Sequence, residues 1–324
     1  MTHAIRFYQT GGPEVMKWEM FDPGMPGPGQ VLVRHRAVGL NYIDVYHRNG
    51  TCPVSLPATP GMEAAGIVED VGSGVDDFRP GDRVAYATGP MGAYAESRIM
   101  PADRLVHVPQ GISDDQAAAM MLQGLTAQYL LRRTYPVKAG DTILVHAAAG
   151  GVGLLLCQWA KHLGATVLGT VGSEDKAALA LANGCDHAIL YRRENFHQRV
   201  MELTQGSKVQ VVYDSVGRDT FDQSLDCLAP LGMMVSFGQS SGMIPPFDIS
   251  QLGARGSLFL TRPSLMAYTA NRSDLLKGAD ELFKMVATEK LKVSVRQRYP
   301  LKEAVQAHVD LEARKTTGAT IFTL

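Results

Sequence analysis

Cysteine is scarce in this sequence. The four cysteines, Cys52, Cys157, Cys185 and Cys227, lie far apart and form no CxxC pair. This spacing excludes the disulfide framework of a small secreted domain and the ligand pattern of a zinc knuckle. Buried thiols in a reducing compartment are the simpler interpretation. We therefore expect a cytoplasmic protein without a structural metal ion.

An excess of charge of either sign is missing as well. The 31 Lys and Arg residues balance 32 Asp and Glu residues, and the net charge of -1 argues against a nucleic-acid partner. No apolar run is as long as a membrane span, and the N-terminal MTHAIRFYQTGG lacks the apolar core of a signal peptide. We expect neither nucleic acid nor a membrane among the partners.

The chain of 324 residues is too long for one hydrophobic core, so two domains are expected. Up to residue 140, short strand-like runs are separated by Gly and Pro turns such as PGPG (26–29) and PGD (80–82). Short and frequent strands of this kind predict a β-rich, barrel-like fold. The runs cover residues 30–38, 64–71, 82–87 and 93–99.

A helix is expected to begin after Ser113, which is a plausible N-cap and is followed by Gln116 at the capping-box position. The apolar run 117–131 predicts more than one helix, with Gly124 as the break.

From residue 141 onward, strand-like and helix-like runs alternate, which predicts parallel βαβ units. Gly164 and Gly184 stand where helix C-caps belong. Six strands complete a doubly wound dinucleotide-binding sheet, so the fold class is α/β. The strands are expected at 142–146, 166–171, 187–190, 209–214, 232–237 and 257–260, and the helices at 152–163, 174–183, 195–203 and 220–228.

After Pro263 the alternation stops. Helix-like segments at 273–287 and 302–311 precede a short strand at 320–324. A tail of roughly 60 residues would be a marginal independent domain, so we expect it to return and pack on the first domain.

The sharpest local signal is VHAAAGGVG (145–153), which follows a predicted strand and opens a helix. Ala147, Gly150 and Gly153 give the spacing AxxGxxG, a partial match to the dinucleotide fingerprint. Such a turn brings backbone N–H groups and the positive helix N-terminus to a pyrophosphate. In the context of six predicted strands, the turn predicts dinucleotide binding rather than a merely structural bend.

The residues at the end of the second strand distinguish NADH from NADPH. In NAD enzymes an Asp or Glu there hydrogen-bonds the ribose 2′-hydroxyl. Here the stretch GTVGS (169–173) has no acid at its tip, and Lys176 follows closely. Glu174 and Asp175 are more simply partners of the helix dipole. NADPH is therefore favoured over NADH, with a solvated basic surface as the alternative.

The motifs together resemble the zinc-independent quinone oxidoreductases of the medium-chain dehydrogenase/reductase superfamily, and the bacterial NADPH:quinone reductases in particular. The resemblance covers essentially the whole length. The matching segments are AVGLNYIDVYHRNG (37–50), PGMEAAGIVEDVGSGV (60–75), PGDRVAY (80–86), HAAAGGVG (146–153), YDSVGRDTF (213–221), VSFGQSSG (235–242) and TRPSL (261–265).

The resemblance implies a split arrangement. Residues 1–124 and 264–324 would form a β-rich, GroES-like barrel catalytic domain, and residues 125–263 an NADPH-binding Rossmann domain inserted between them. The active site would lie in the cleft between the domains. A homodimer is expected to pair through the exposed sixth strand, residues 257–260.

A zinc site is not expected. Zinc alcohol dehydrogenases on this scaffold carry Cys where Asn41 stands and His where Met62 stands, and an amide and a thioether cannot replace thiolate and imidazole ligands. Without a Lewis acid an ordinary ketone is a poor hydride acceptor, whereas a quinone spreads the added charge. The expected reaction is thus reduction of a quinone by NADPH.

The resemblance also implies the site residues. Asn41, Tyr42 and Tyr46 would line the catalytic cleft, and Ser173, Lys176, Tyr191 and Arg314 would surround the 2′-phosphate. The full set of implied cofactor contacts is Asn41, Asp44, Thr126, Tyr129, Gly150, Gly151, Val152, Gly153, Gly172, Ser173, Lys176, Tyr191, Ser215, Phe237, Gly238, Ser240, Phe259, Leu260, Thr261 and Arg314.

Two alternatives remain open at this point. One is NADPH-dependent reduction of activated C=C bonds in alkenals, enones or enoyl thioesters. The other is a cofactor-binding structural protein with vestigial turnover. Cys52 stands where relatives commonly carry Tyr, which makes the range of quinones uncertain.

Overall fold

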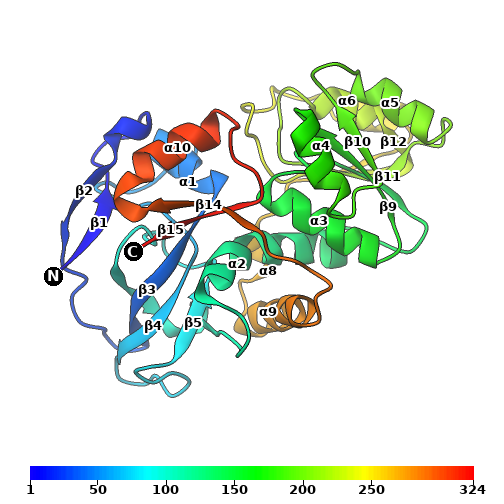
Figure 1. The fold of residues 1–324 in the computed structure, drawn as a ribbon. Coiled ribbons are helices and arrows are strands. Elements are labelled where there is room, and N and C mark those ends of the chain that lie inside the picture. Colours follow the sequence, from blue (N-terminus) through cyan, green and yellow to red (C-terminus); the bar gives the residue numbers. More distant parts are fainter. The chain divides into compact units, whose positions relative to one another are not determined.

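The computed structural model describes residues 1–324, which divide into two compact units (Figure 1). The chain enters unit 2 in the middle of helix α2 (Asp114–Tyr129). It leaves after Ala267 and returns once more for the short segment Glu289–Lys292, which the sequence did not suggest. Unit 1 comprises Met1–Leu125, Tyr268–Thr288 and Val293–Leu324, and unit 2 comprises Thr126–Ala267 and Glu289–Lys292.

Unit 2 is built on a six-stranded parallel sheet in the order β10-β9-β8-β11-β12-β13. This is the doubly wound order of dinucleotide-binding domains, and it confirms the predicted α/β class. The strands are β8 (Thr142–Val145), β9 (Thr166–Val171), β10 (His187–Leu190), β11 (Val209–Asp214), β12 (Leu228–Ser236) and β13 (Phe259–Thr261).

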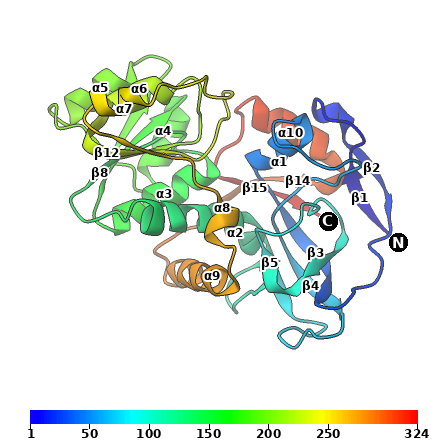
Figure 2. The same ribbon diagram turned by 180° about the vertical axis from the view of Figure 1, so that it is seen from behind.

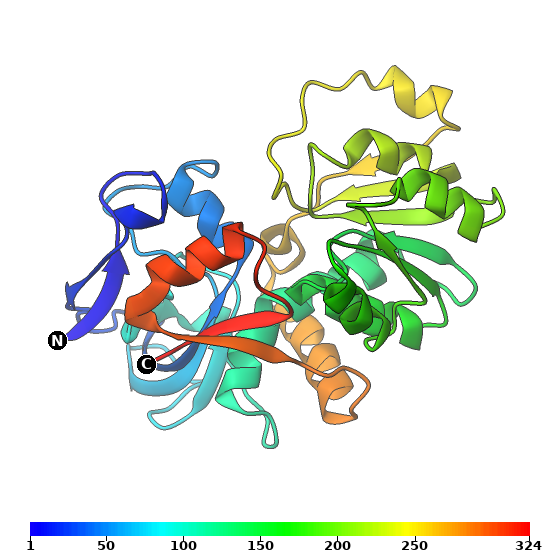
Figure 3. The same cartoon turned by 45° about the horizontal axis from the view of Figure 1, so that its top comes forward.

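Helices cover both faces of this sheet (Figure 3). α3 (Gly151–His162) and α4 (Glu174–Leu181) pack on one face, and α5 (Phe196–Leu203) and α6 (Phe221–Asp226) on the other. Gly164 and Gly184 follow α3 and α4 with φ values of 87° and 90°, which confirms both predicted C-caps. Two short helices, α7 (Ser250–Ala254) and α8 (Leu265–Tyr268), flank β13 in the chain.

Unit 1 is β-rich. Its main sheet has the order β14-β15-β3-β4-β5-β7, with β6 also paired to β3, beside a separate β1–β2 hairpin. β15 pairs antiparallel with β3, so the tail returns to the first unit as predicted, whereas β14 and the hairpin were not predicted. The strands are β1 (Thr2–Arg6), β2 (Lys17–Phe21), β3 (Gln30–Leu40), β4 (Ala64–Val71), β5 (Arg83–Tyr86), β6 (Ser97–Pro101), β7 (Val106–His107), β14 (Val295–Pro300) and β15 (Ala319–Thr323).

Four helices accompany this sheet: α1 (Tyr42–Asn49), the first part of α2, α9 (Arg272–Ala287) and α10 (Ala304–Glu312). Ser113 and Gln116 exchange the reciprocal bonds of a capping box at the start of α2, as predicted. The predicted break at Gly124 is wrong, because α2 runs through it. A Cβ there would lie 2.5 Å from Leu282 on α9, so this glycine lets two helices approach closely (Figure 2). No helix in the protein combines the length and the apolar character needed to cross a membrane.

Candidate active site

The glycine turn links β8 to α3. Gly150 is the N-cap of α3, has no side-chain cap and leaves the first N–H groups of the helix available to an anion. A Cβ on Gly153 would lie 2.3 Å from the carbonyl oxygen of Ala147, so only glycine fits where the helix packs on the strand end. Ala147 itself adopts a left-handed φ of 54°. The turn is thus a cradle of backbone donors, which fits the pyrophosphate of a dinucleotide.

The end of β9 carries no carboxylate. Ser173 is the N-cap of α4, and its hydroxyl accepts the Lys176 backbone N–H. A Cβ on Gly172 would lie 2.9 Å from the hydroxyl oxygen of Tyr191, so the ends of β9 and β10 meet here. The carboxylate oxygen Oε1 of Glu174 forms an ion pair with the guanidinium of Arg193 at 2.8 Å, and both side chains are exposed. The Ser173 hydroxyl and the Tyr191 phenol therefore lie at this strand end, with Lys176 in the first turn of α4, and this set of groups suits a phosphate better than a ribose hydroxyl.

The ends of β11 and β12 are bound to each other. Asp214 accepts the backbone N–H groups of Val216 and Gly217 and fixes the turn after β11. Ser240 donates its N–H to the carbonyl of Ser215, and a Cβ on Gly238 would lie 2.7 Å from that same oxygen. The guanidinium of Arg262 binds the carbonyl of Gly238 at 2.9 Å.

A buried polar chain, not anticipated from the sequence, lies beneath these turns. Ser224 donates to the carbonyl of Thr220, so its oxygen accepts from His146 Nε2 at 2.8 Å. The other ring nitrogen then accepts from the Thr170 hydroxyl at 2.9 Å. Thr220 in turn donates to Asp214 at 2.7 Å. Burial lowers the pKa of His146, so the neutral ring links Thr170 at the end of β9 to Ser224 on α6.

In unit 1 the predicted catalytic residues lie on α1 and at its N-cap. Asn41 is the N-cap, and Asp44 accepts its backbone N–H at 2.9 Å. Tyr42 and Tyr46 lie edge to face, with ring centroids 5.3 Å apart. Burial raises the pKa of Tyr42, while the charge of Arg314 acts to lower it, which places that arginine near α1.

The amide of Asn41 is held by two buried side chains. Its Nδ2 donates to Glu63 Oε2 at 2.6 Å, and its Oδ1 accepts from Gln123 Nε2 at 3.2 Å. Burial raises the pKa of Glu63 to about 8. Neither Glu63 nor Gln123 was identified from the sequence. No three His, Cys, Asp or Glu side chains of the chain gather as a metal site would require.

A second buried group lies behind α1. Tyr94 donates to Asp44 Oδ2 at 3.0 Å and is bound to His308 Nε2 at 3.0 Å. Burial raises the pKa of Asp44 to about 7 and lowers that of His308 to about 3. Burial therefore favours the neutral form of both groups.

The predicted site residues divide between the two units. Asn41, Tyr42, Asp44, Tyr46 and Arg314 belong to unit 1, so Arg314 is not in the same unit as the other residues predicted around the 2′-phosphate. Phe259, Leu260 and Thr261 form the edge strand β13. The remaining predicted residues of unit 2 are Thr126 and Tyr129 on α2, Gly150, Gly151, Val152 and Gly153 at the start of α3, Gly172 and Ser173 after β9, Lys176 on α4, Tyr191 after β10, Ser215 after β11, and Phe237, Gly238 and Ser240 after β12.

Two family profiles match the chain: "Alcohol dehydrogenase GroES-like domain" over residues 27–110 and "Zinc-binding dehydrogenase" over residues 151–284. A quinone oxidoreductase of Pseudomonas aeruginosa is 52% identical over 99% of both chains. A 2-haloacrylate reductase of a Burkholderia species is 46% identical over 99% of both. The crystal structure of Escherichia coli quinone oxidoreductase complexed with NADPH superposes with a TM-score of 0.98 at 48% identity, covering 99% of this chain and 100% of that one.

Proposed function

This chain belongs to the quinone oxidoreductase family of the medium-chain dehydrogenase/reductase superfamily, and we propose from this premise that it reduces quinones with NADPH without zinc. One observation carries the choice of cofactor: the glycine cradle of unit 2 adjoins a second strand whose tip has Ser173 and no carboxylate. The Escherichia coli relative was crystallised with NADPH, which supports the same choice.

We assign the binding of NADPH to unit 2. The turn from Gly150 to Gly153 would hold the pyrophosphate, and Ser173, Lys176 and Tyr191 the 2′-phosphate. Ser215 and Gly238 would contact the ribose and ring from the strand ends that Asp214 orders. NADPH supplies a hydride when bound; the protein orients it and excludes water.

We assign the substrate side to unit 1, as a GroES-like catalytic domain. Asn41, Tyr42 and Tyr46 would receive the quinone there. Asn41 and Met62 stand where zinc ligands would be needed, and the Asn41 amide is bound to protein groups. Because a quinone delocalises the added charge over an aromatic hydroquinone anion, it can be reduced without a Lewis acid.

The decisive assay measures NADPH oxidation with a panel of quinones and, in parallel, with α,β-unsaturated aldehydes and 2-haloacrylate. Quinones are expected to give the higher kcat/KM. The similarity to a 2-haloacrylate reductase supports reduction of activated C=C bonds as the second candidate, and a preference for those substrates would establish it. Negligible turnover with every acceptor would favour a structural role.

Replacing Lys176 by Ala should weaken NADPH binding by about tenfold or more and leave NADH binding almost unchanged. The reason is that a charge-assisted contact to the 2′-phosphate contributes roughly 1.5–3 kcal/mol, and NADH has no such phosphate. Fluorescence titration gives both dissociation constants, with exposed Lys277→Ala as the control. Equal weakening of both cofactors would assign Lys176 to the fold or the pyrophosphate.

We also propose a homodimer that pairs through β13. This strand ends the sheet of unit 2, and Phe259 and Leu260 on it are 56% and 38% exposed. Unpaired backbone groups beside exposed apolar side chains favour pairing with a two-fold mate. Light scattering at micromolar concentration should give twice the mass of the chain. A monomer mass, or a dimer that persists when Leu260 is replaced by Pro, would contradict this interface.

We propose a cytoplasmic location. Cys157, Cys185 and Cys227 are buried free thiols, which suits a reducing compartment.

A further inference from the structure

Glu63 has no part in the reaction outlined so far, although its side chain is completely buried beside Asn41. Its Oε2 accepts the Asn41 amide at 2.6 Å, and its Oε1 accepts the backbone N–H of Leu122 at 2.8 Å. Both carboxyl oxygens therefore act as acceptors for fixed donors. Burying a carboxyl group costs free energy unless hydrogen bonds replace those lost to water. A buried acid at this position therefore indicates a role in holding the groups that bind it.

The surrounding backbone is shaped to admit this carboxyl group. A Cβ on Gly39 would lie 2.4 Å from Glu63 Oε2 and 2.4 Å from the carbonyl oxygen of Ala118. Gly39 also donates its N–H to the backbone carbonyl of Glu63 at 3.0 Å. β3, the start of β4 and α2 thus meet at a position where only glycine leaves room for the acid.

The consequence for Asn41 is a fixed amide with one uncommitted hydrogen. The amide oxygen accepts from Gln123, and one amide hydrogen is bound to Glu63. A side-chain amide carries two N–H donors, so a single N–H has no protein partner. The Leu122 N–H occupies the other carboxyl oxygen of Glu63, and Gln123 donates to the amide oxygen of Asn41, so these contacts together determine which end of the amide carries the nitrogen.

We propose that Glu63 is a positioning residue that orients the Asn41 amide so that its remaining N–H binds the quinone oxygen that becomes negative on reduction. This inference rests on the proposed quinone reduction. Addition of one hydride to the quinone gives the hydroquinone monoanion, which then takes one proton from water to give the hydroquinone. A preorganised N–H at the developing charge stabilises the anion, as donors of oxyanion holes do.

The first variant reverses the amide. In Glu63→Gln, one of the two acceptors becomes an NH2 group. If the new carbonyl keeps Leu122, the new NH2 faces Asn41, whose amide must turn its oxygen toward residue 63. Gln123 can turn with it, and the free N–H moves to the other side, while the backbone N–H of Asp44 loses the amide oxygen as its cap. The expected result is a fall in kcat of about a hundredfold or more, with the NADPH dissociation constant within about twofold of wild type.

The second variant separates orientation from stability. In the double variant Asn41→Asp/Glu63→Gln, the new amide at position 63 accepts from Leu122 and donates to the new carboxylate at position 41. Gln123 donates to the second oxygen of that carboxylate. Every buried bond is restored, and Asp is also a good N-cap for α1. The protein should therefore regain wild-type resistance to urea, yet kcat with quinone should stay at least about a hundredfold low, since no donor hydrogen remains at position 41.

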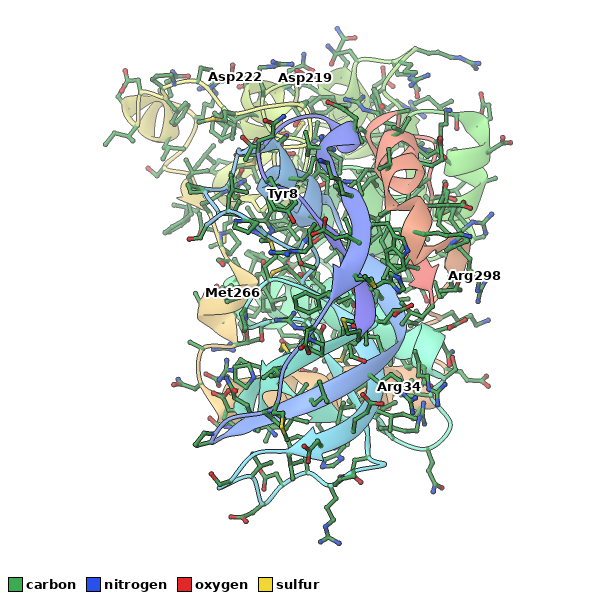
Figure 4. The ribbon with its side chains drawn as sticks, turned by 90° about the vertical axis from the view of Figure 1, so that its left-hand side faces the viewer. Tyr8, Arg34, Asp219, Asp222, Met266 and Arg298 are labelled. Atoms are coloured by element: carbon green, nitrogen blue, oxygen red, sulfur yellow. The ribbon has the colours of Figure 1, made fainter.

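The control makes the same chemical change on the surface of the same unit. Glu69 on β4 pairs with Arg34 at 3.2 Å, and the Arg34 side chain, labelled in Figure 4, is 53% exposed. Glu69→Gln should leave kcat, KM and the NADPH dissociation constant unchanged, because exposed ion pairs contribute little.

Two results would overturn the inference: a kcat for Glu63→Gln within threefold of wild type, or a double variant that recovers activity together with stability. Failure of the proposed function looks different, because wild-type protein would then oxidise no NADPH with any quinone. If it reduced enals instead, the same variants would be compared with an enal, whose carbonyl oxygen develops the same charge. A normal kcat in the variants would again reject the role of Glu63.

Discussion

Replacing Gly153 by Ala should destabilise unit 2 by about 3 kcal/mol or more and abolish NADPH binding. The added methyl group would lie 2.3 Å from the carbonyl oxygen of Ala147 and 2.9 Å from two backbone atoms of Ala148. None of these atoms belongs to a flexible side chain, so the turn and the start of α3 must move apart, and overpacking of this kind costs several kcal/mol. Urea unfolding and fluorescence titration with NADPH measure the two effects.

Gly150 offers the matched control three residues earlier. A Cβ there meets only the Ala147 carbonyl oxygen, at 3.2 Å, and its φ of -79° suits any residue. Gly150→Ala should therefore fold with a change in unfolding free energy within about 1 kcal/mol, yet bind NADPH more weakly because the methyl group enters the cradle. A Gly153→Ala protein with wild-type stability and affinity would show that this turn is not the cofactor cradle.

Stability should be greatest near pH 6.5 and should fall by about 1 kcal/mol between pH 6.5 and 8. Burial raises the pKa of Asp44 to about 7 and that of Glu63 to about 8, whereas both groups titrate near pH 4 in the unfolded chain. Between these values the folded state holds protons that the unfolded state has lost. Rising pH therefore lowers the unfolding free energy until each folded-state pKa is passed.

Buried histidines act in the opposite direction below pH 6.5. Burial lowers the pKa of His35 and His308 to about 3, and it lowers the pKa of His47 and His146 as well. Below about pH 6.5 the histidines of the unfolded chain bind protons, whereas the buried rings of the folded protein stay neutral. The unfolding free energy therefore rises with pH in this range. Between pH 6.5 and about 7.5 the unfolded rings lose their remaining protons, which offsets part of the fall caused by the carboxyl groups, and above that pH only the two carboxyl groups still change.

The measurement is urea unfolding between pH 5.5 and 8.5. Each pKa unit corresponds to about 1.4 kcal/mol, so Glu63 accounts for most of the fall above pH 6.5. Glu63→Gln should flatten that limb, while Glu69→Gln should keep it. An identical fall in both variants would mean that Glu63 is ionised in the folded protein already at pH 6.5.

The fold of unit 2 was predictable because buried parallel strands are short apolar runs between turn residues. The strands at 166–171, 187–190 and 209–214 agree with the structure to the residue. The residues predicted to bind the cofactor follow these strands, and the doubly wound order brings the carboxyl ends of the strands to one edge of the sheet. Local sequence is sufficient to predict this fold because each strand–helix unit buries an apolar strand between two layers of helices in the same way.

Unit 1 was less predictable. α1 was missed although Asn41, Asp44 and Gly50 supply its N-cap, capping-box partner and left-handed C-cap. Its tyrosines and β-branched residues favour a strand by local preference, and tertiary packing decides otherwise. β14 alternates half-buried and exposed residues, and it pairs with β15, a strand more than twenty residues away in the sequence.

The Glu63–Asn41–Gln123 network could not be found from the sequence, because no short motif connects its members. Glu63 is 22 residues from Asn41, and Gln123 is 82 residues from it. They meet only because α2 packs across the start of β4. The glycine at position 39 is a signal that could have pointed to the carboxyl group, but only once its neighbours in space were known.

The position of β15 has a consequence for biosynthesis. This strand lies between β14 and β3 and pairs Thr323 with Ala37, so the sheet of unit 1 cannot be completed until residues 319–323 have left the ribosome. Unit 2 takes almost all of its residues from the contiguous stretch Thr126–Ala267 and can fold during translation. Unit 1, which begins before unit 2 in the chain, is therefore completed after it. Until then, the open edge of β3 around Ala37–Leu40 is where a nascent chain is most exposed to aggregation and to capture by chaperones.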